Sequence, residues 1–211
     1  MINLLLALFG GYLVGAVPFA LVAAKLFGLP DPRTFGSRNP GATNVLRTGH
    51  KAAALLTLIG DAGKGAAAVL AVQVLTHDAI LSATAGVGAF FGHLFSFWLR
   101  FQGGKGVATA LGVLLAIEPL LGAIAALVWL TVAAVSRYSS LAALIAALLT
   151  PAIAWLLSLP TPIVALVTGM AAVLILRHRQ NIRNLIHGRE SKIGQSAQAA
   201  NEAQSPPDNR S

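Results

Sequence analysis

The chain contains no cysteine among its 211 residues, and only 7 aspartate and glutamate residues against 15 lysine and arginine residues. The absence of cysteine excludes disulfides, thiolate nucleophiles and cysteine-based metal sites. The few carboxylates form no cluster, and the 5 histidines do not have the spacing of metal ligands. We therefore expect neither a metal nor any other cofactor.

Apolar residues are what the chain has in abundance. They make up 56% of it, charged residues make up 10%, and the mean hydropathy is +0.74. They form long blocks instead of alternating with charge, which excludes an ordinary soluble domain and predicts an all-α polytopic membrane protein. We predict one integral-membrane domain over residues 1–190 and a disordered polar tail over 191–211. The apolar start has no basic n-region or A-x-A site, so we interpret it as the first helix and not as a signal peptide.

Short polar breakers such as "LPDP", "GGKG" and "LPTP" separate seven apolar segments. These segments span residues 2–24, 52–75, 79–99, 107–117, 120–135, 141–158 and 163–176. A six-span alternative, with one helix through Glu118 and Pro119, would place Arg137 opposite the basic cluster after residue 176, against the positive-inside rule. We predict seven transmembrane helices, with the N-terminus outside and the C-terminus in the cytoplasm.

This topology places nearly every lysine and arginine on the cytoplasmic side and leaves only Asp78 and Glu118 as charges in the outer connections. The net charge of +8 is then explained mainly by orientation, and we expect no nucleic-acid partner. Lys64 lies inside a span, where we expect it to form an ion pair with Asp61, three residues earlier. We interpret His93 as a packed or interfacial histidine.

The fourth segment, Val107–Ile117, is too short to cross a membrane. A bilayer core of ~30 Å takes about 20 helical residues, and this helix would reach ~16 Å. It follows Gly103, Gly104, Lys105 and Gly106. A glycine turn into a helix N-terminus offers free N–H groups and about half a positive charge to an anion, and a lysine adds a full charge. We expect a half-length helix. A plain glycine loop is the default interpretation of this motif alone, and a recessed phosphate site at the start of the helix is the functional interpretation.

Two other inner connections carry short polar groups beside arginine. In "GSRNPGATNVLR", Ser37 and Asn44 accompany Arg47 among glycines that permit close backbone approach. Ser140 lies in a short inner connection beside an arginine and has a hydroxyl that a phosphate can accept. Such groups suit an anion, and an ordinary cytoplasmic loop is the alternative.

The segment after the last apolar run reads "RHRQNIRNLIHGRE". Its basic residues are typical of a snorkelling cluster on anionic lipid. That interpretation leaves His178, Asn181 and Glu190 without a role. His178 and Asn181 are three residues apart and would share one face of a helix.

Taken together, "GSRNPGATNVLR", "GGKGVAT" and "HRQNIRNLIHGRE" resemble the three motifs of the bacterial PlsY family of acyl-phosphate:glycerol-3-phosphate acyltransferases. The resemblance covers nearly all of residues 1–190. It implies a seven-helix inner-membrane enzyme that transfers a fatty acyl group from acyl phosphate to the 1-hydroxyl of glycerol 3-phosphate. The products would be lysophosphatidic acid and inorganic phosphate, in the first step of phospholipid biosynthesis. Arg38 stands where we would often expect glycine, which puts only that backbone position in doubt.

The resemblance also implies which residues act. Those given catalytic roles are Ser37, Arg47, Lys105, His178 and Asn181. The substrate-binding set, drawn from the motifs and the residue patterns together, is Ser37, Asn44, Arg47, Gly103, Gly104, Lys105, Gly106, Thr109, Ser140, His178, Asn181 and Glu190. The expected partners are acyl phosphate, glycerol 3-phosphate and membrane lipid; the sequence does not identify the enzyme that supplies the acyl phosphate.

Acyl phosphate is already activated, so the resemblance implies no covalent intermediate, coenzyme A or acyl carrier protein at the transfer step. No H-x-x-x-x-D dyad supplies a base. The hypothesis is that the acyl phosphate's own oxygen takes the hydroxyl proton, with His178 as the competing general base. Two other classes stay open. A transporter or flippase for a phosphorylated molecule is disfavoured by the small size and the missing internal repeat, and a structural scaffold leaves the polar inner segments unexplained.

Overall fold

The computed structural model describes residues 1–196 and 198, and all regular structure within them is helical. Every predicted apolar segment contains a helix, which confirms the all-α class. The helices are α1 (Ile2–Gly15), α2 (Phe19–Leu26), α3 (Ala42–Leu46), α4 (Lys51–Thr76), α5 (Ala79–Leu94), the 3₁₀ helix η1 (Phe97–Leu99), α6 (Val107–Ile117), α7 (Pro119–Ser136), α8 (Ser139–Leu156), α9 (Thr161–Arg177) and α10 (Arg179–Ile186).

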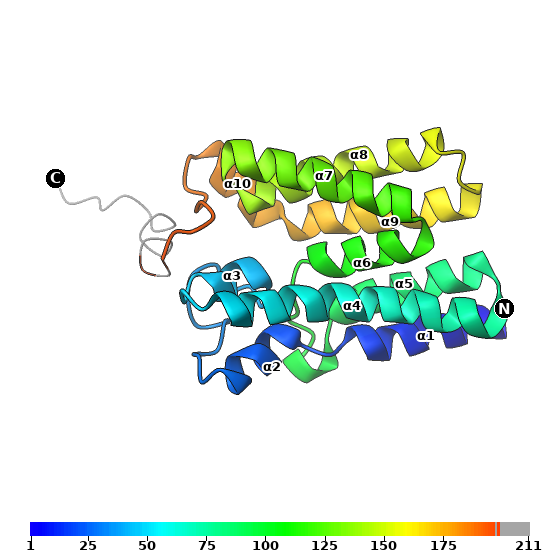
Figure 1. Ribbon diagram of the computed structural model, residues 1–211, viewed down its shortest axis with the longest axis horizontal. Helices are drawn as coiled ribbons and strands as arrows, with labels where there is room; N and C mark the ends of the chain where they lie inside the picture. Colours follow the sequence, from blue (N-terminus) through cyan, green and yellow to red (C-terminus); the bar gives the residue numbers. More distant parts are fainter. Residues whose placement is uncertain (197, 199–211) are drawn as a thin grey trace.

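The helices form two layers, with the short α6 between them (Figure 1). Helices α1, α2, α4 and α5 make one layer and α7, α8 and α9 make the other, while α6 contacts α4, α5 and α7. The predicted break at Glu118 is confirmed: α6 ends at Ile117, and the Glu118 carboxylate caps α7, which begins at Pro119. A single helix through this point is therefore wrong.

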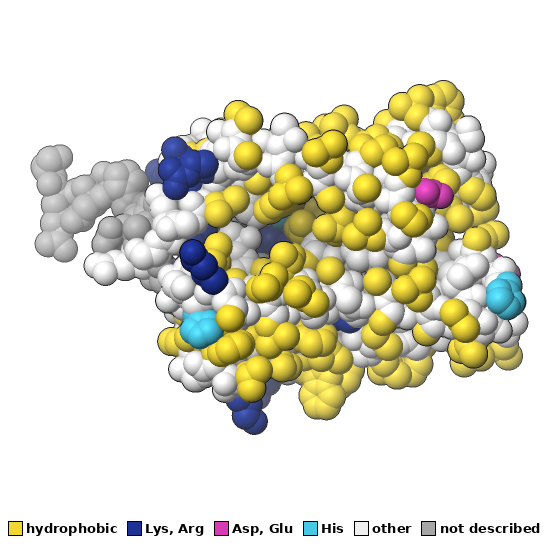
Figure 2. Space-filling view, viewed as in Figure 1, with side chains coloured by type: hydrophobic (Ala, Val, Ile, Leu, Met, Phe, Trp, Pro, Cys, Tyr) yellow, Lys and Arg dark blue, Asp and Glu magenta, His cyan; other side chains and the backbone are white. Residues whose placement is uncertain are grey.

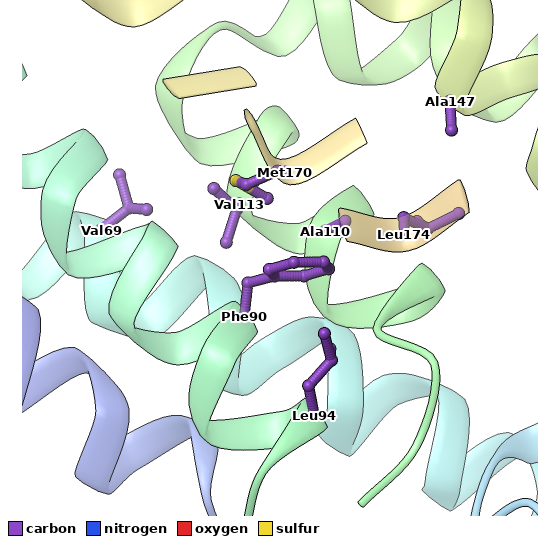
Figure 3. Packing of buried hydrophobic residues seen from close by; sticks show 8 residues of the cluster. All are labelled: Val69, Phe90, Leu94, Ala110, Val113, Ala147, Met170 and Leu174. Carbon is purple, nitrogen blue, oxygen red and sulfur yellow. The ribbon is translucent and has the colours of Figure 1, made fainter. Parts of the chain in front are cut away.

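The main apolar cluster lies where α6 meets both layers (Figure 3). Its buried members are Val69, Phe90, Leu94, Ala110, Val113, Ala147, Met170 and Leu174. Lipid is as apolar as these side chains, so close packing rather than exclusion of water holds membrane helices together. This cluster fixes the start of α6 against the ends of α5 and α9, and the candidate site lies beyond those ends.

Helices α1 and α5 pack backbone to backbone. A Cβ built on Gly11 would lie 2.0 Å from the carbonyl oxygen of Ala85, and one on Gly15 would lie 2.0 Å from that of Ala89. Small residues spaced four apart permit this approach, as is common between membrane helices. Any larger side chain would push α1 away from α5.

Among the described residues, five helical segments are long and apolar enough to cross a membrane. The number rises to six if α9 and α10, which are bent by 55° relative to each other, count as one span. Helix α6 is too short, as predicted, and seven spans and their orientation stay predictions. Hydrophobic side chains cover much of the face in Figure 2, and most of the basic side chains visible there gather at one end. The N-terminus lies at the opposite end (Figure 1).

Two details differ from the simple segment picture. The first apolar segment is not one helix, because α1 ends at Gly15 and α2 begins after Pro18, which has no N–H to continue a helix. The predicted tail begins in contact with the protein: Ser191 is buried, and the Ile193 N–H donates to the Arg137 carbonyl. For residues 197 and 199–211, the predicted disorder lies outside the described residues.

Candidate active site

Three distant segments meet at the Glu190 carboxylate. The Asn181 amide and the Ser140 hydroxyl each donate to its Oε1, both at 2.7 Å, and Lys105 Nζ donates to Asn181 Oδ1 at 2.6 Å. Ser140 lies in the first turn of α8, and Asn181 lies on α10. Lys105 belongs to the loop at residues 102–106, which we call the glycine loop. The structure thus brings together residues that the sequence placed in separate motifs.

The first inner loop reaches this cluster through Arg47. Its Nη1 donates to Asn44 Oδ1 at 3.0 Å, and its Nη2 hydrogen-bonds to the Ser191 hydroxyl. Glu190 acts electrostatically on both Arg47 and Lys105, so the two cations share one carboxylate. Basic side-chain atoms are visible in a hollow between the layers in Figure 2.

Asn44 holds the loop rather than facing a ligand. Its amide nitrogen donates to the carbonyls of Pro32 and Phe35 at 2.7 and 3.2 Å, and its Oδ1 accepts from the Ser37 N–H at 3.0 Å. The Asn44 residue is 2% exposed. Within the described residues the Ser37 hydroxyl makes no hydrogen bond, so it stays available to a ligand.

The charges of the cluster favour an anion. Burial lowers the pKa of the Lys105 ammonium to about 8; Glu190 opposes the shift, and Arg47 and Arg177 add to it. Burial also lowers the pKa of the Arg47 guanidinium, which stays a cation at neutral pH. Glu190 Oε2 and Arg47 Nε are buried without a hydrogen-bond partner among the described residues. Buried polar atoms are normally paired, so these two are suited to a bound ligand or water.

His178 lies at the junction of α9 and α10 and is 2% exposed. Its Nδ1 lies 2.8 Å from the Leu174 carbonyl oxygen, which can only accept, so Nδ1 carries a proton. In the neutral ring, Nε2 is then free to accept a proton or hydrogen bond. Lys105 is close enough to act on His178 electrostatically, which links the histidine to the cluster.

The glycine loop is held on two sides. The N–H groups of Gly103 and Gly104 donate to the carbonyls of Leu94 and His93 at 3.1 and 3.2 Å. On the other side, Arg177 Nη2 donates to the carbonyls of Gly103 and Gly104 at 3.2 and 3.1 Å. A Cβ on Gly103 would lie 2.0 Å from the His93 carbonyl oxygen, so only glycine fits there.

Gly106 ends the loop with φ +85° and is the N-cap of α6, with no side-chain cap. The first N–H groups of α6 are therefore open to a ligand, next to Lys105. Thr109 lies in this first turn, is fully buried, and its hydroxyl has no hydrogen-bond partner among the described residues. Thr109 belongs to the predicted substrate-binding set, and its position on α6 is what links it to the cluster around Glu190.

Sequence reasoning missed three contacts of the site. Arg177 at the end of a span was sufficiently explained by membrane orientation, although it holds the glycine loop. Ser191 fell in the predicted tail, although it pairs with Arg47. The Thr43 and Ser139 hydroxyls lie 3.1 Å apart and tie the first loop to α8. The sequence signal for these residues is their position in or beside the predicted motifs.

The fold and the cluster define an integral membrane protein with many apolar helices and a largely buried group of basic and polar side chains at one end. A family model described as glycerol-3-phosphate acyltransferase matches residues 5–188. The chain belongs to this family and is an acyltransferase. A glycerol-3-phosphate acyltransferase of Aromatoleum aromaticum is 55% identical over 194 residues, covering 92% of this chain and 98% of that protein. One of Nitrosomonas europaea is 51% identical, covering 90% and 97%.

The fold is also that of a solved relative. The crystal structure of PlsY (YgiH), an integral membrane glycerol 3-phosphate acyltransferase, in its glycerol 3-phosphate form matches with a TM-score of 0.84 at 36% identity. The match covers 90% of this chain and 96% of that one. The lysophosphatidic acid form of PlsY matches with a TM-score of 0.82 at 34% identity, covering 90% and 95%.

Proposed function

We propose that this protein transfers a fatty acyl group from acyl phosphate to the 1-hydroxyl of glycerol 3-phosphate, giving lysophosphatidic acid and inorganic phosphate as the first step of phospholipid biosynthesis. The observation that carries the proposal is the convergence of Arg47, Lys105, Ser140 and Asn181 around Glu190. Both substrates carry phosphate. The glycerol 3-phosphate form of a similar PlsY structure supports the choice of acceptor.

The proposed phosphate-binding groups are cations and short donors. Lys105 and Arg47 supply positive charge, and the Ser140 hydroxyl and Asn181 amide supply neutral donors that now converge on one carboxylate oxygen. The uncapped start of α6 adds backbone N–H groups next to Lys105. We assign the segment from Gly103 to Thr109 to glycerol 3-phosphate binding.

In the transfer step, the 1-hydroxyl oxygen forms a bond to the acyl carbonyl carbon, and the bond from that carbon to the phosphate oxygen breaks. The electron pair leaves with phosphate, and the hydroxyl proton ends on phosphate. Lys105, Arg47 and the α6 N-terminus would stabilise the developing oxyanion and the departing phosphate. Because the donor is activated, positioning and charge stabilisation carry the catalysis.

The base is either an oxygen of the acyl phosphate, which we favour, or His178 Nε2. Two variants separate them. Both His178→Ala and His178→Asn lack Nε2, but the asparagine amide can still donate to the Leu174 carbonyl. The favoured mechanism expects His178→Asn to retain more turnover than His178→Ala. A loss of more than ~10⁴ in both variants, with substrate binding intact, would exceed the usual range of a general base and contradict the substrate-assisted mechanism.

Phosphate release tests the function itself. Purified protein should release phosphate from palmitoyl phosphate only when glycerol 3-phosphate is also present. Replacing palmitoyl phosphate by palmitoyl coenzyme A should give no lysophosphatidic acid and release no coenzyme A. If instead glycerol 3-phosphate crosses a vesicle membrane without phosphate release, the protein is a transporter and the proposal is wrong.

We also propose seven spans in the bacterial inner membrane, with the N-terminus outside and the active site facing the cytoplasm. The gathering of basic side chains at the α10 end supports this orientation (Figure 2). The chain has no cysteine, so single-cysteine variants can be labelled without background. In intact spheroplasts, a membrane-impermeant maleimide should label His77→Cys but not Arg183→Cys. The reverse pattern would overturn the orientation.

A further inference from the structure

Three ionisable side chains lie between α4 and α5, outside the cluster around Glu190. The side chains of Asp61, Lys64 and His93 are 4%, 3% and 8% exposed. The predicted Asp61–Lys64 ion pair is confirmed, with Oδ1 and Nζ 2.7 Å apart. Buried charges inside a membrane protein are costly, and apolar residues of similar volume often stabilise a fold as well or better. Stability alone therefore does not account for the three groups, which we call the buried triad.

The buried triad joins three elements. Lys64 Nζ lies 2.9 Å from His93 Nδ1 and donates to the Val17 carbonyl at 2.8 Å. The Val17 carbonyl lies at the break between α1 and α2, just before Pro18, and the lysine satisfies it where no helix does. An ammonium has only donors, so Nδ1 is the acceptor where it bonds Lys64. The same Nδ1 lies 3.4 Å from Asp61 Oδ1, so the His93 ring contacts both partners of the ion pair.

His93 connects the buried triad to the glycine loop. Its backbone carbonyl accepts from the Gly104 N–H at 3.2 Å. Its ring lies against the same residue, because a Cβ on Gly104 would be 2.2 Å from His93 Nε2. Asp61, Lys64, His93 and Gly104 all line one cavity of about 10 Å³, about the smallest space that holds a water molecule. Gly104 is the residue immediately before Lys105.

We propose that the buried triad positions the glycine loop: Lys64 fixes the His93 ring, the ring and carbonyl of His93 fix Gly104, and Gly104 sets where Lys105 meets Asn181. Asp61, Lys64 and His93 are thus positioning residues that do not touch substrate. This inference rests on the proposed function of Lys105 in binding phosphate. A displacement of ~1 Å at a reacting centre can cost ~10²-fold in rate, so loosening the loop should lower turnover measurably.

The test measures the loop directly, by hydrogen–deuterium exchange of the amides of residues 102–106. Lys64→Met keeps an unbranched side chain of similar length and removes its donors, so these amides should exchange faster. His93→Leu should have the same effect. In His93→Asn the amide oxygen can replace Nδ1 as acceptor for Lys64, so its exchange should fall between the unmodified protein and His93→Leu.

The matched control is Ser82→Ala. Ser82 is also buried between α4 and α5 and hydrogen-bonds to Gln73, but these residues lie at the other end of the two helices from the glycine loop. This variant should leave loop exchange unchanged. The single variant Lys64→Met leaves Asp61 unpaired and can misfold, so Asp61→Asn with Lys64→Met is tested beside it, because the pair of changes leaves no unpaired charge.

Turnover is measured on the same variants. The proposal expects kcat/KM for glycerol 3-phosphate to fall by about 10- to 100-fold in Lys64→Met and in the double variant, and to stay unchanged in Ser82→Ala. Loop exchange equal to that of Ser82→Ala in the folded double variant would overturn the proposal, whatever the activity. If the unmodified protein shows no acyl transfer, the proposed function fails, while the exchange result still decides whether the buried triad holds the loop.

Discussion

The pH dependence of turnover is the sharpest test of Lys105. The pKa of this lysine is lowered to about 8, far below its ordinary value, and only the protonated form can attract phosphate. With this pKa, about nine-tenths of the free enzyme carries the charge at pH 7 and about one-tenth at pH 9. We therefore expect kcat/KM for glycerol 3-phosphate to fall roughly tenfold between these pH values. The activity is present below the pKa and lost above it.

The same geometry predicts a separation between two kinetic parameters. A bound phosphate favours the charged lysine and raises its pKa, so the loss of kcat should begin at higher pH than the loss of kcat/KM.

The stability of the folded protein should change with pH in the opposite direction to its activity. The folded protein holds fewer protons on Lys105 than the unfolded chain does between about pH 8 and 10.4, so this residue adds stability as pH rises through that window. Deprotonation of Lys105 therefore does not unfold the protein, and unfolding from this cause cannot explain the loss of activity at high pH.

The assay follows phosphate release from palmitoyl phosphate at pH 6.5 to 10, with the enzyme-free hydrolysis subtracted at each pH. Lys105→Arg is the control, because a guanidinium keeps its charge over this range; its activity should be lower, since its shape differs, but without the alkaline fall. An unmodified enzyme whose kcat/KM is level to pH 10, or a Lys105→Arg variant with the same alkaline fall, would refute the assignment.

Two further predictions follow from the packing. Arg177→Met removes the donors to the Gly103 and Gly104 carbonyls and should lower kcat/KM about 10- to 100-fold, since hydrogen bonds from charged groups contribute ~1.5–3 kcal/mol. The control is Arg179→Met, at an exposed arginine, which should change kcat/KM little. Equal losses in both variants would mean that only the total charge matters. Gly15→Leu should destabilise the protein by ~1–3 kcal/mol or more, because α1 must move away from α5. The measurement is the midpoint of thermal unfolding in detergent, which should fall. An unchanged midpoint would contradict the close packing of α1 on α5.

The parts of the site that could be predicted are those whose signal is local. The 11-residue apolar run after the glycines around Lys105 is too short to cross a membrane, and both the short helix and its uncapped start are observed. The spacing of His178 and Asn181 predicts one shared helix face, but His178 lies at the bend between α9 and α10 and only Asn181 is inside α10. The pairing of Asp61 with Lys64 also follows from their spacing and from the cost of an unpaired charge in a span.

The parts that could not be predicted depend on which helices meet. Arg177 satisfies the positive-inside rule whether or not it contacts the glycine loop, so its position in the sequence does not predict that contact. The link from Lys64 to His93 joins residues 29 positions apart, and it exists only because α4 packs on α5. Ser191 looks like the start of a polar tail until the fold places it beside Arg47.

Glu190 resolves a problem that any such site must face before substrate arrives. Arg47 and Lys105 repel each other in a partly buried place, and each also loses hydration there. One carboxylate between them offsets part of that cost and also receives Ser140 and Asn181, so the donors are ordered without a ligand. Because a single carboxylate leaves the pair of cations only partly compensated, the cluster keeps a net positive charge. The site can therefore be assembled by the fold and still attract a phosphate.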